Sequence, residues 1–180
     1  MLKLSKDIFL FTNLFEDLNR IFIELQDCNW QMWGRGTNDP NYKMGELSFI
    51  KGNDYLSEQI NSATLLCINQ YIEEFNIDKT LYRYDTNGIY VRKWDFPMGG
   101  ITIHRDHTYD DKGNTMPVEY TLCGYLNDDY EGALMEFPEH NISIKPPAGS
   151  AIIFPSQELH LVTDLVDKHR YMWSSFVYRK

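Results

Sequence analysis

The spacing of apolar positions changes along the chain and predicts two kinds of secondary structure. Residues 6–12 alternate loosely between apolar and polar side chains, which predicts a short strand. Apolar side chains then recur every three or four positions in residues 13–25 and 57–75, the spacing of amphipathic helices. Asn13 and Glu16 have the spacing of a capping box, so we predict that the first helix begins at Asn13.

From residue 81 onward the apolar positions form short runs rich in β-branched and aromatic side chains, separated by turn residues. The predicted strands are residues 81–84, 89–94, 101–106, 118–126, 133–137, 142–144, 151–154, 159–163 and 171–178. Two helices followed by short strands predict a mostly β fold: a double-stranded β-helix, or cupin-like jelly roll, buttressed by two N-terminal helices. We expect a single domain over residues 1–180, with residues 1–79 as helical buttress and loop and residues 80–180 as jelly-roll core.

Residues 29–54 show no clear period and contain several Gly and Asn residues between aromatic side chains. A long irregular segment in a small domain is often functional. Two interpretations stay open, a substrate lid and an ordered wrap that buries its aromatic side chains against the sheet.

Composition narrows the possible partners. The formal net charge of −9, without a cluster of Lys and Arg, argues against a nucleic-acid partner. The apolar run Ile8–Phe11 is too short for a signal segment or a membrane span. Cys28, Cys67 and Cys123 lack metal-binding or redox spacing, which favours buried thiols in a reducing compartment. We therefore expect a cytoplasmic protein without a membrane or nucleic-acid partner, and its oligomeric state stays open.

Three residues have the pattern of a metal site. His104 and Asp106 end a predicted strand, where side chains two positions apart share a face, and His160 lies in another predicted strand. Two histidines and one carboxylate on one face of a metal are the ligands of non-haem Fe(II) oxygenases. Arg170 follows His160 by ten residues. Its guanidinium group can hold a carboxylate bidentately, which suits a dicarboxylate cosubstrate that chelates the iron with its other end.

These residues resemble the Fe(II)/2-oxoglutarate-dependent oxygenases, and among them the prolyl 4-hydroxylase-like branch. The resemblance extends over residues 82–180. It rests on five elements in the family's order and spacing: His104–Asp106, Gly124–Asn127, Gly132–Pro138, Pro146–Pro155, and His160 with Arg170.

The resemblance implies that His104, Asp106 and His160 bind Fe(II). It also implies hydroxylation of a C–H bond in a protein or peptide residue, with 2-oxoglutarate and O2 as cosubstrates and succinate and CO2 as products. A free amino acid or another small molecule stays open as the substrate. So does a jelly-roll module that binds a metal or ligand without turnover.

For the cosubstrate, the resemblance implies that Arg170 pairs with the distal carboxylate of 2-oxoglutarate. Tyr125 would add its hydroxyl to the same carboxylate. Leu134 would form an apolar wall of the pocket. Trp94 stands where the family often has a tyrosine.

Two other positions argue against the activities of related halogenases and nucleic-acid demethylases. Asp106 argues against a halogenase, because the resembling halogenases have a small residue in its place. Phe176 stands where the resembling nucleic-acid demethylases carry a second arginine. We expect Arg105 to face away from the metal, and His107 and His169 to be surface or neighbouring groups.

Overall fold

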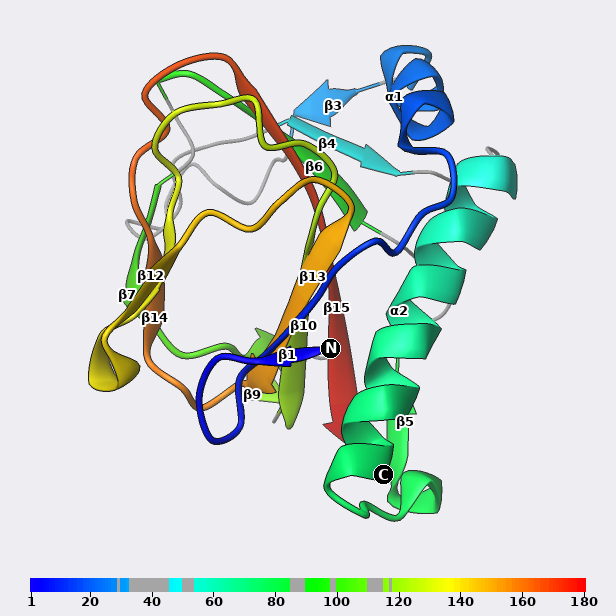
Figure 1. Cartoon of the computed structure of the whole chain (residues 1–180), viewed down its shortest axis with the longest axis vertical. Helices are drawn as coiled ribbons and strands as arrows, with labels where there is room; N and C mark the ends of the chain where they lie inside the picture. Colours follow the sequence, from blue (N-terminus) through cyan, green and yellow to red (C-terminus); the bar gives the residue numbers. More distant parts are fainter. Residues whose placement is uncertain are drawn as a thin grey trace.

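A computed structural model of the chain describes residues 1–28, 30–32, 46–49, 54–84, 90–97, 100–109, 115–116 and 118–180. Figure 1 shows three layers, a small sheet, a large sheet and helix α2 against the outer face of the large sheet. The helices are α1 (Leu18–Gln26) and α2 (Asp54–Glu74), with the 3-10 helices η1 (Lys79–Leu81) and η2 (Pro138–His140).

The strands are β1 (Leu2–Lys3), β2 (Phe9–Phe11), β3 (Gln31–Met32), β4 (Glu46–Phe49), β5 (Tyr82–Tyr84), β6 (Tyr90–Asp95), β7 (Ile101–His104), β8 (Thr108–Tyr109), β9 (Thr115–Met116), β10 (Tyr120–Tyr125), β11 (Met135–Phe137), β12 (Ile142–Ile144), β13 (Ser150–Pro155), β14 (His160–Val162) and β15 (His169–Arg179). In the described part of the chain, the large sheet has the order β1-β2-β13-β10-β15-β6-β4-β3, with β5 also paired to β15. The small sheet has the order β12-β11-β14-β7, and β8 pairs with β9.

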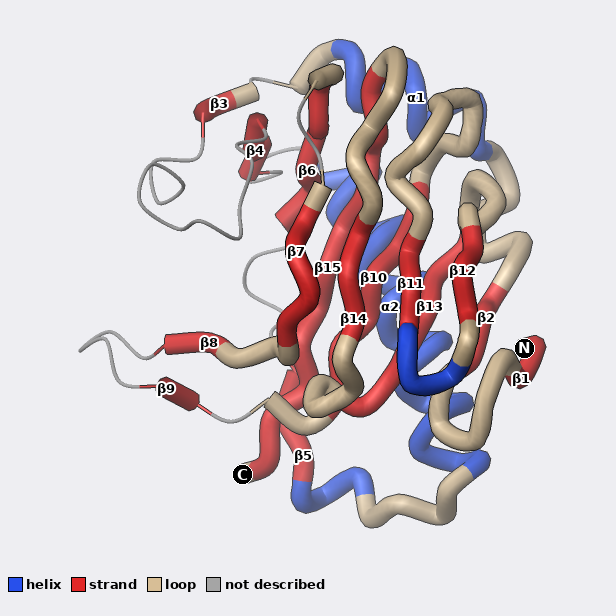
Figure 2. Tube along the Cα trace, turned by 90° about the vertical axis from the view of Figure 1, so that its left-hand side faces the viewer, coloured by secondary structure: helices blue, strands red, loops and turns tan. Residues whose placement is uncertain are grey.

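The two sheets face each other, with the small sheet in front of the large one in Figure 2 and the helices behind. The strands pair antiparallel in both sheets. This arrangement confirms the predicted jelly roll with helical buttresses.

Side chains that alternate along the large sheet form two separate cores. The helix-side core lies between this sheet and the helices and includes Ile60, Ile68, Leu122, Trp173 and Val177. The inter-sheet core lies between the two sheets and includes Tyr125, Tyr130, Met135, Ile152 and Phe154. Because Leu122 and Tyr125 belong to the same strand, β10, one strand supplies both cores.

Helix α1 begins later than the sequence predicts. Asn13 adopts a left-handed conformation with φ of 56°, and the N–H of Leu14 donates to the Gly149 carbonyl (3.0 Å) instead of entering a helix. The N-cap is Asp17, whose side chain accepts from the Arg20 N–H (3.0 Å). The predicted capping box at Asn13 is therefore wrong, because asparagine also tolerates the left-handed region.

The expectation of irregular structure in residues 29–54 is wrong where this segment is described. Residues 31–32 and 46–49 form β3 and β4, which extend the large sheet beyond β6. The first 79 residues therefore add strands as well as helices. Residues 29, 33–45 and 50–53 lie outside the described residues, and with them the question of a lid.

The described helices and cysteines bear on two further expectations. None of the helices in the described segments has the length and apolarity that a membrane crossing requires. Cys28, Cys67 and Cys123 form no disulfide among the described residues; Cys67 is buried and the other two are half-buried. Burial raises the pKa of the Cys67 thiol to about 12, so this group is protonated at neutral pH.

Candidate active site

The three predicted metal ligands meet between the sheets at one end of the small sheet. His104 ends β7 and lies directly opposite His160 on β14, with ring centroids 4.2 Å apart. Asp106 follows β7, and its backbone N–H donates to the Ser156 carbonyl (2.9 Å). Two adjacent strands and a fixed turn therefore place the three side chains together.

The ligand atoms have the geometry of a metal site. His104 Nε2 lies 3.5 Å from Asp106 Oδ1, and His160 Nε2 lies 3.5 Å from Asp106 Oδ2. One ligand atom from each of the three residues lies within 4.8 Å of the other two. This donor set of two imidazoles and one carboxylate fits Fe(II).

Backbone carbonyls orient both imidazoles. Nδ1 of His104 bonds the Thr102 carbonyl (2.8 Å), and Nδ1 of His160 bonds the Glu158 carbonyl (2.9 Å). A carbonyl only accepts, so Nδ1 donates in each ring and Nε2 keeps its lone pair for a metal.

The protonation of the site favours metal binding. Burial acts to raise the pKa of Asp106, but the neighbouring imidazoles of His104 and His160, which favour the carboxylate when they are protonated, outweigh it and hold the pKa below its usual value. Burial lowers the pKa of His160. At neutral pH Asp106 is therefore a carboxylate and His160 a neutral imidazole, the forms that bind a metal.

Arg170 is buried between the sheets, with only 1% of its surface exposed. It lies opposite Trp94 on β6, and its Cζ is 5.6 Å from the centroid of the Trp94 ring. Burial lowers the Arg170 pKa, while the nearby Tyr125 and Tyr130 act to raise it. Tyr125 on β10 pairs with Met172 on β15, so it lies on the same face of the large sheet as Arg170. The roles of Arg170 and Tyr125 in binding 2-oxoglutarate stay predictions.

Two buried donors beside Arg170 fit a carboxylate ligand. Trp94 Nε1 and Tyr130 Oη are buried and have no hydrogen-bond partner among the described residues. Buried polar groups are almost always hydrogen-bonded, so such atoms call for an acceptor. The distal carboxylate of 2-oxoglutarate would supply acceptor oxygens and a negative charge beside the guanidinium group.

Leu134 does not join the described cores. It is half-buried, whereas Ala133 and Met135 on either side belong to the inter-sheet core. Ala133 has φ of 49°, and this left-handed residue interrupts the alternation before β11. The role of Leu134 as a pocket wall stays a prediction.

The neighbours of the triad lie as expected from the sequence. Arg105 is exposed, and its Nε donates to the Gln157 carbonyl (2.8 Å). His107 is exposed, and its Nδ1 lies 3.4 Å from the Arg105 carbonyl oxygen. The half-exposed ring of His169 contacts the carboxylate of Asp95.

Sequence reasoning missed two polar residues near the site, Tyr130 and Arg92. Arg92 lies two positions before Trp94 on β6, so its side chain is on the same face, and its Nη1 donates to Ser174 Oγ (2.7 Å). Strand alternation from Trp94 could have identified Arg92. Tyr130 follows β10 in a turn, where no period applies.

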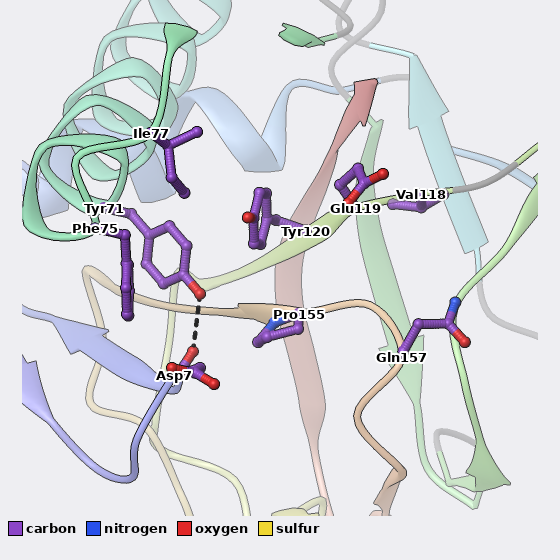
Figure 3. A pocket seen from close by; sticks show the side chains of 9 residues that line it. All are labelled: Asp7, Tyr71, Phe75, Ile77, Val118, Glu119, Tyr120, Pro155 and Gln157. Atoms are coloured by element: carbon purple, nitrogen blue, oxygen red, sulfur yellow. Dashed lines mark hydrogen bonds between the residues drawn. The ribbon is translucent and has the colours of Figure 1, made fainter. Parts of the chain in front are cut away.

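A cleft of about 500 Å³ lies away from these residues, at the C-terminal end of α2. Figure 3 shows Tyr71 between Phe75 and Tyr120 in its lining, with the Tyr71 hydroxyl directed at Asp7. Its lining includes none of the predicted site residues, so it is separate from the candidate active site.

The fold and the triad together define a non-haem Fe(II) oxygenase site in a jelly roll. The sequence matches the 2OG-Fe(II) oxygenase superfamily over residues 89–178, half of the chain, and the protein belongs to this superfamily. Its cofactor is Fe(II) and its cosubstrate is 2-oxoglutarate. No curated protein sequence matches the chain.

Solved structures of prolyl hydroxylases have a similar fold. The viral collagen prolyl hydroxylase vCPH from Paramecium Bursaria Chlorella virus-1, in its 2OG complex, has a TM-score of 0.70 and 17% identity, covering 96% of both chains. The Trichoplax adhaerens prolyl hydroxylase, in complex with a hypoxia inducible factor peptide fragment, has a TM-score of 0.68 and 16% identity, covering 97% of this chain and 84% of that one. A Pseudomonas putida prolyl-4-hydroxylase has a TM-score of 0.67 and 14% identity, covering 98% and 94%.

Proposed function

We propose that the protein hydroxylates a prolyl residue of a peptide or protein, using Fe(II), 2-oxoglutarate and O2 and releasing succinate and CO2. The observation that carries this proposal is the complete triad, with Asp106 placed between the Nε2 atoms of His104 and His160. The prolyl substrate is supported by the likeness of the fold to prolyl hydroxylases that act on collagen or bind a hypoxia inducible factor peptide.

The residues of the chain bind the metal, orient its ligands and exclude water from one side of the site. His104, Asp106 and His160 would hold the iron on one side and leave its other positions open. When bound, Fe(II) would supply the site at which O2 oxidises 2-oxoglutarate to succinate and CO2 and the substrate C–H bond to an alcohol. Phe154 packs on His160 at 4.8 Å between ring centroids, which keeps water from that side of the site.

Hydroxylation is favoured over two related reactions. Asp106 occupies the position that a halide would need, because a carboxylate there already fills an iron coordination site. Phe176 on β15 supplies no charge at the position where the resembling demethylases have an arginine. Both residues therefore support simple oxygen insertion into a C–H bond.

A second candidate substrate is a small molecule with a carboxylate group, such as a free amino acid. Arg92 is half-buried on the face of β6 that also carries Trp94. Its guanidinium group donates to Ser174, whose side chain lies on the inter-sheet face of β15. An arginine in this place could bind the carboxylate of a small substrate. A peptide substrate has no free carboxylate next to an internal proline.

The test is oxygen-triggered turnover with matched substrates. We would incubate the Fe(II)-loaded protein with 2-oxoglutarate anaerobically, add O2, and measure succinate and substrate mass. The substrates are proline-containing peptides, the same peptides with alanine in place of proline, and free proline. The proposal expects gain of one oxygen atom only in the proline peptides. Oxidation of free proline alone would support the small-molecule candidate, and succinate release without oxidation of any of these substrates would contradict prolyl hydroxylation.

A further inference from the structure

Tyr130 carries a buried hydroxyl that the predicted site does not use. The residue lies in the connection between β10 and β11, five positions after Tyr125, and is completely buried. Its Oη has no hydrogen-bond partner among the described residues. A hydroxyl taken out of water without a partner is destabilising, so its presence calls for a ligand or another explanation.

The ring of Tyr130 is held from outside the pocket. Lys145 Nζ donates to the Tyr130 carbonyl (3.2 Å) and lies 5.7 Å from the centroid of the tyrosine ring. The ring packs in the inter-sheet core with Tyr125. These contacts fix the backbone and ring of Tyr130.

The electrostatic neighbours of the Tyr130 hydroxyl include Arg170 of the cosubstrate pocket and two carboxylates outside it, Asp128 and Asp129. Burial raises the pKa of Tyr130 to about 12, and the positive charge of Arg170 acts against this rise. Tyr130 in turn acts to raise the pKa values of both Arg170 and Tyr125. Since the hydroxyl is protonated at neutral pH, it is available as a hydrogen-bond donor beside the guanidinium group.

We propose that Tyr130 is a cosubstrate-binding residue whose hydroxyl donates to the distal carboxylate of 2-oxoglutarate, beside Arg170 and Tyr125. The carboxylate then receives a donor that is otherwise left without an acceptor. Hydrogen bonds to an ionised acceptor are stronger than neutral ones, so the contribution to affinity is measurable. The proposal is independent of the substrate that is oxidised.

Calorimetry on Mn(II)-loaded protein tests the assignment without turnover. Wild type and Tyr130→Phe are titrated with 2-oxoglutarate and with 2-oxobutyrate, which has the same 2-oxo acid end but no distal carboxylate. We expect Tyr130→Phe to weaken 2-oxoglutarate binding about tenfold and to leave 2-oxobutyrate binding unchanged. Equal weakening of both acids, or no weakening of either, would overturn the proposal. Tyr71→Phe, which removes another buried hydroxyl, is the control and should change neither affinity.

Thermal unfolding separates ligand binding from a structural role. Without metal and cosubstrate, Tyr130→Phe should melt at the same temperature as wild type or higher, because it removes a buried hydroxyl that lacks a partner. With saturating Mn(II) and equal 2-oxoglutarate, the rise in Tm should be smaller in the variant than in wild type. A lower Tm without ligand together with an equal rise on binding would show a structural hydroxyl and contradict the proposal. A wild type that fails to bind 2-oxoglutarate would instead contradict the whole cosubstrate site.

Discussion

The two faces of the large sheet differ in how they satisfy the polar atoms of one buried tryptophan and one buried tyrosine on each side. On the helix side, Trp173 Nε1 donates to Thr64 Oγ1 (3.1 Å) and the Tyr71 hydroxyl donates to the Asp7 carbonyl (3.1 Å). On the inter-sheet side, the corresponding atoms of Trp94 and Tyr130 have no partner among the described residues. The tryptophan and tyrosine on the helix side therefore have hydrogen-bond partners, whereas Trp94 and Tyr130 on the inter-sheet side do not have one among the described residues.

This difference indicates that the helix-side face mainly stabilises the fold, whereas the inter-sheet face mainly binds ligands. The helix-side core is closed by contacts within the chain, such as the edge-to-face packing of Phe15 on Trp173. The inter-sheet face carries a buried guanidinium group and donors that suit an anionic ligand, and the two histidines lie on the small sheet opposite it. Changes on the inter-sheet face should therefore alter ligand binding and turnover, whereas changes on the helix side should alter folding.

The largest effect is expected at the metal. Asp106→Ala removes one of three ligands, so iron-dependent succinate release should fall by at least about a thousandfold. Asp106 makes no contribution to the helix-side core, so the Tm of the metal-free protein should change little. Succinate assays and thermal unfolding measure both. Retained turnover would remove Asp106 from the metal site.

The next effect is expected at the buried cation. Arg170→Ala should weaken 2-oxoglutarate binding about a hundredfold, because it removes the charged partner of the distal carboxylate. Mn(II) affinity should stay within about twofold, since the triad is untouched. Calorimetric titrations with each ligand measure the two affinities, and Arg83→Ala on β5 is the matched control. Equal loss of both affinities would contradict a specific cosubstrate role.

On the helix side, Gly124→Ala should destabilise the fold without changing the site. A Cβ at Gly124 would lie 2.2 Å from atoms of the Trp173 ring, so one of them has to move. We expect the free energy of unfolding to fall by about 3 kcal/mol in urea titrations. The 2-oxoglutarate affinity of the folded protein should stay unchanged. An altered affinity without lost stability would reverse the assigned roles of the two faces.

The smallest effect is expected for Tyr71→Phe. This change removes one hydrogen bond to the Asp7 carbonyl, so the free energy of unfolding should fall by about 1 kcal/mol. Urea unfolding compared with Tyr130→Phe gives the sharpest contrast, because the ligand-free form should lose stability only when the satisfied hydroxyl is removed. An equal loss of unfolding free energy in Tyr71→Phe and Tyr130→Phe would contradict the proposed difference between the two faces.

The sequence predicted β7 and β10 to β15 well, because short apolar runs bounded by turn residues are clear there, but it missed β8 and β9. It failed at Asn13, where a residue that suits a cap also suits the left-handed turn that the chain adopts. It also missed β3 and β4. Their few residues, interrupted by glycine-rich sequence, are strands because they pair with each other and with β6. Such pairing is tertiary and leaves little periodicity.

The metal site was more predictable than the cosubstrate pocket. His104 and Asp106 are two positions apart, and the motifs place His160 in a second strand. The pairing of His104 with His160 then follows from strand order. The burial of Tyr130 depends on how a turn packs against the large sheet, which no local pattern encodes. The left-handed Ala133 likewise breaks the alternation that would assign a direction to Leu134.

The most direct test of the central account is oxygen-triggered succinate release from protein loaded anaerobically with Fe(II) and 2-oxoglutarate. Wild type and Asp106→Ala would be compared at equal concentration, after thermal unfolding has established that both are folded. The account predicts that wild type releases succinate when O2 is added and that the variant does not. Equal succinate release from the two proteins would contradict the assignment of His104, Asp106 and His160 as the iron site.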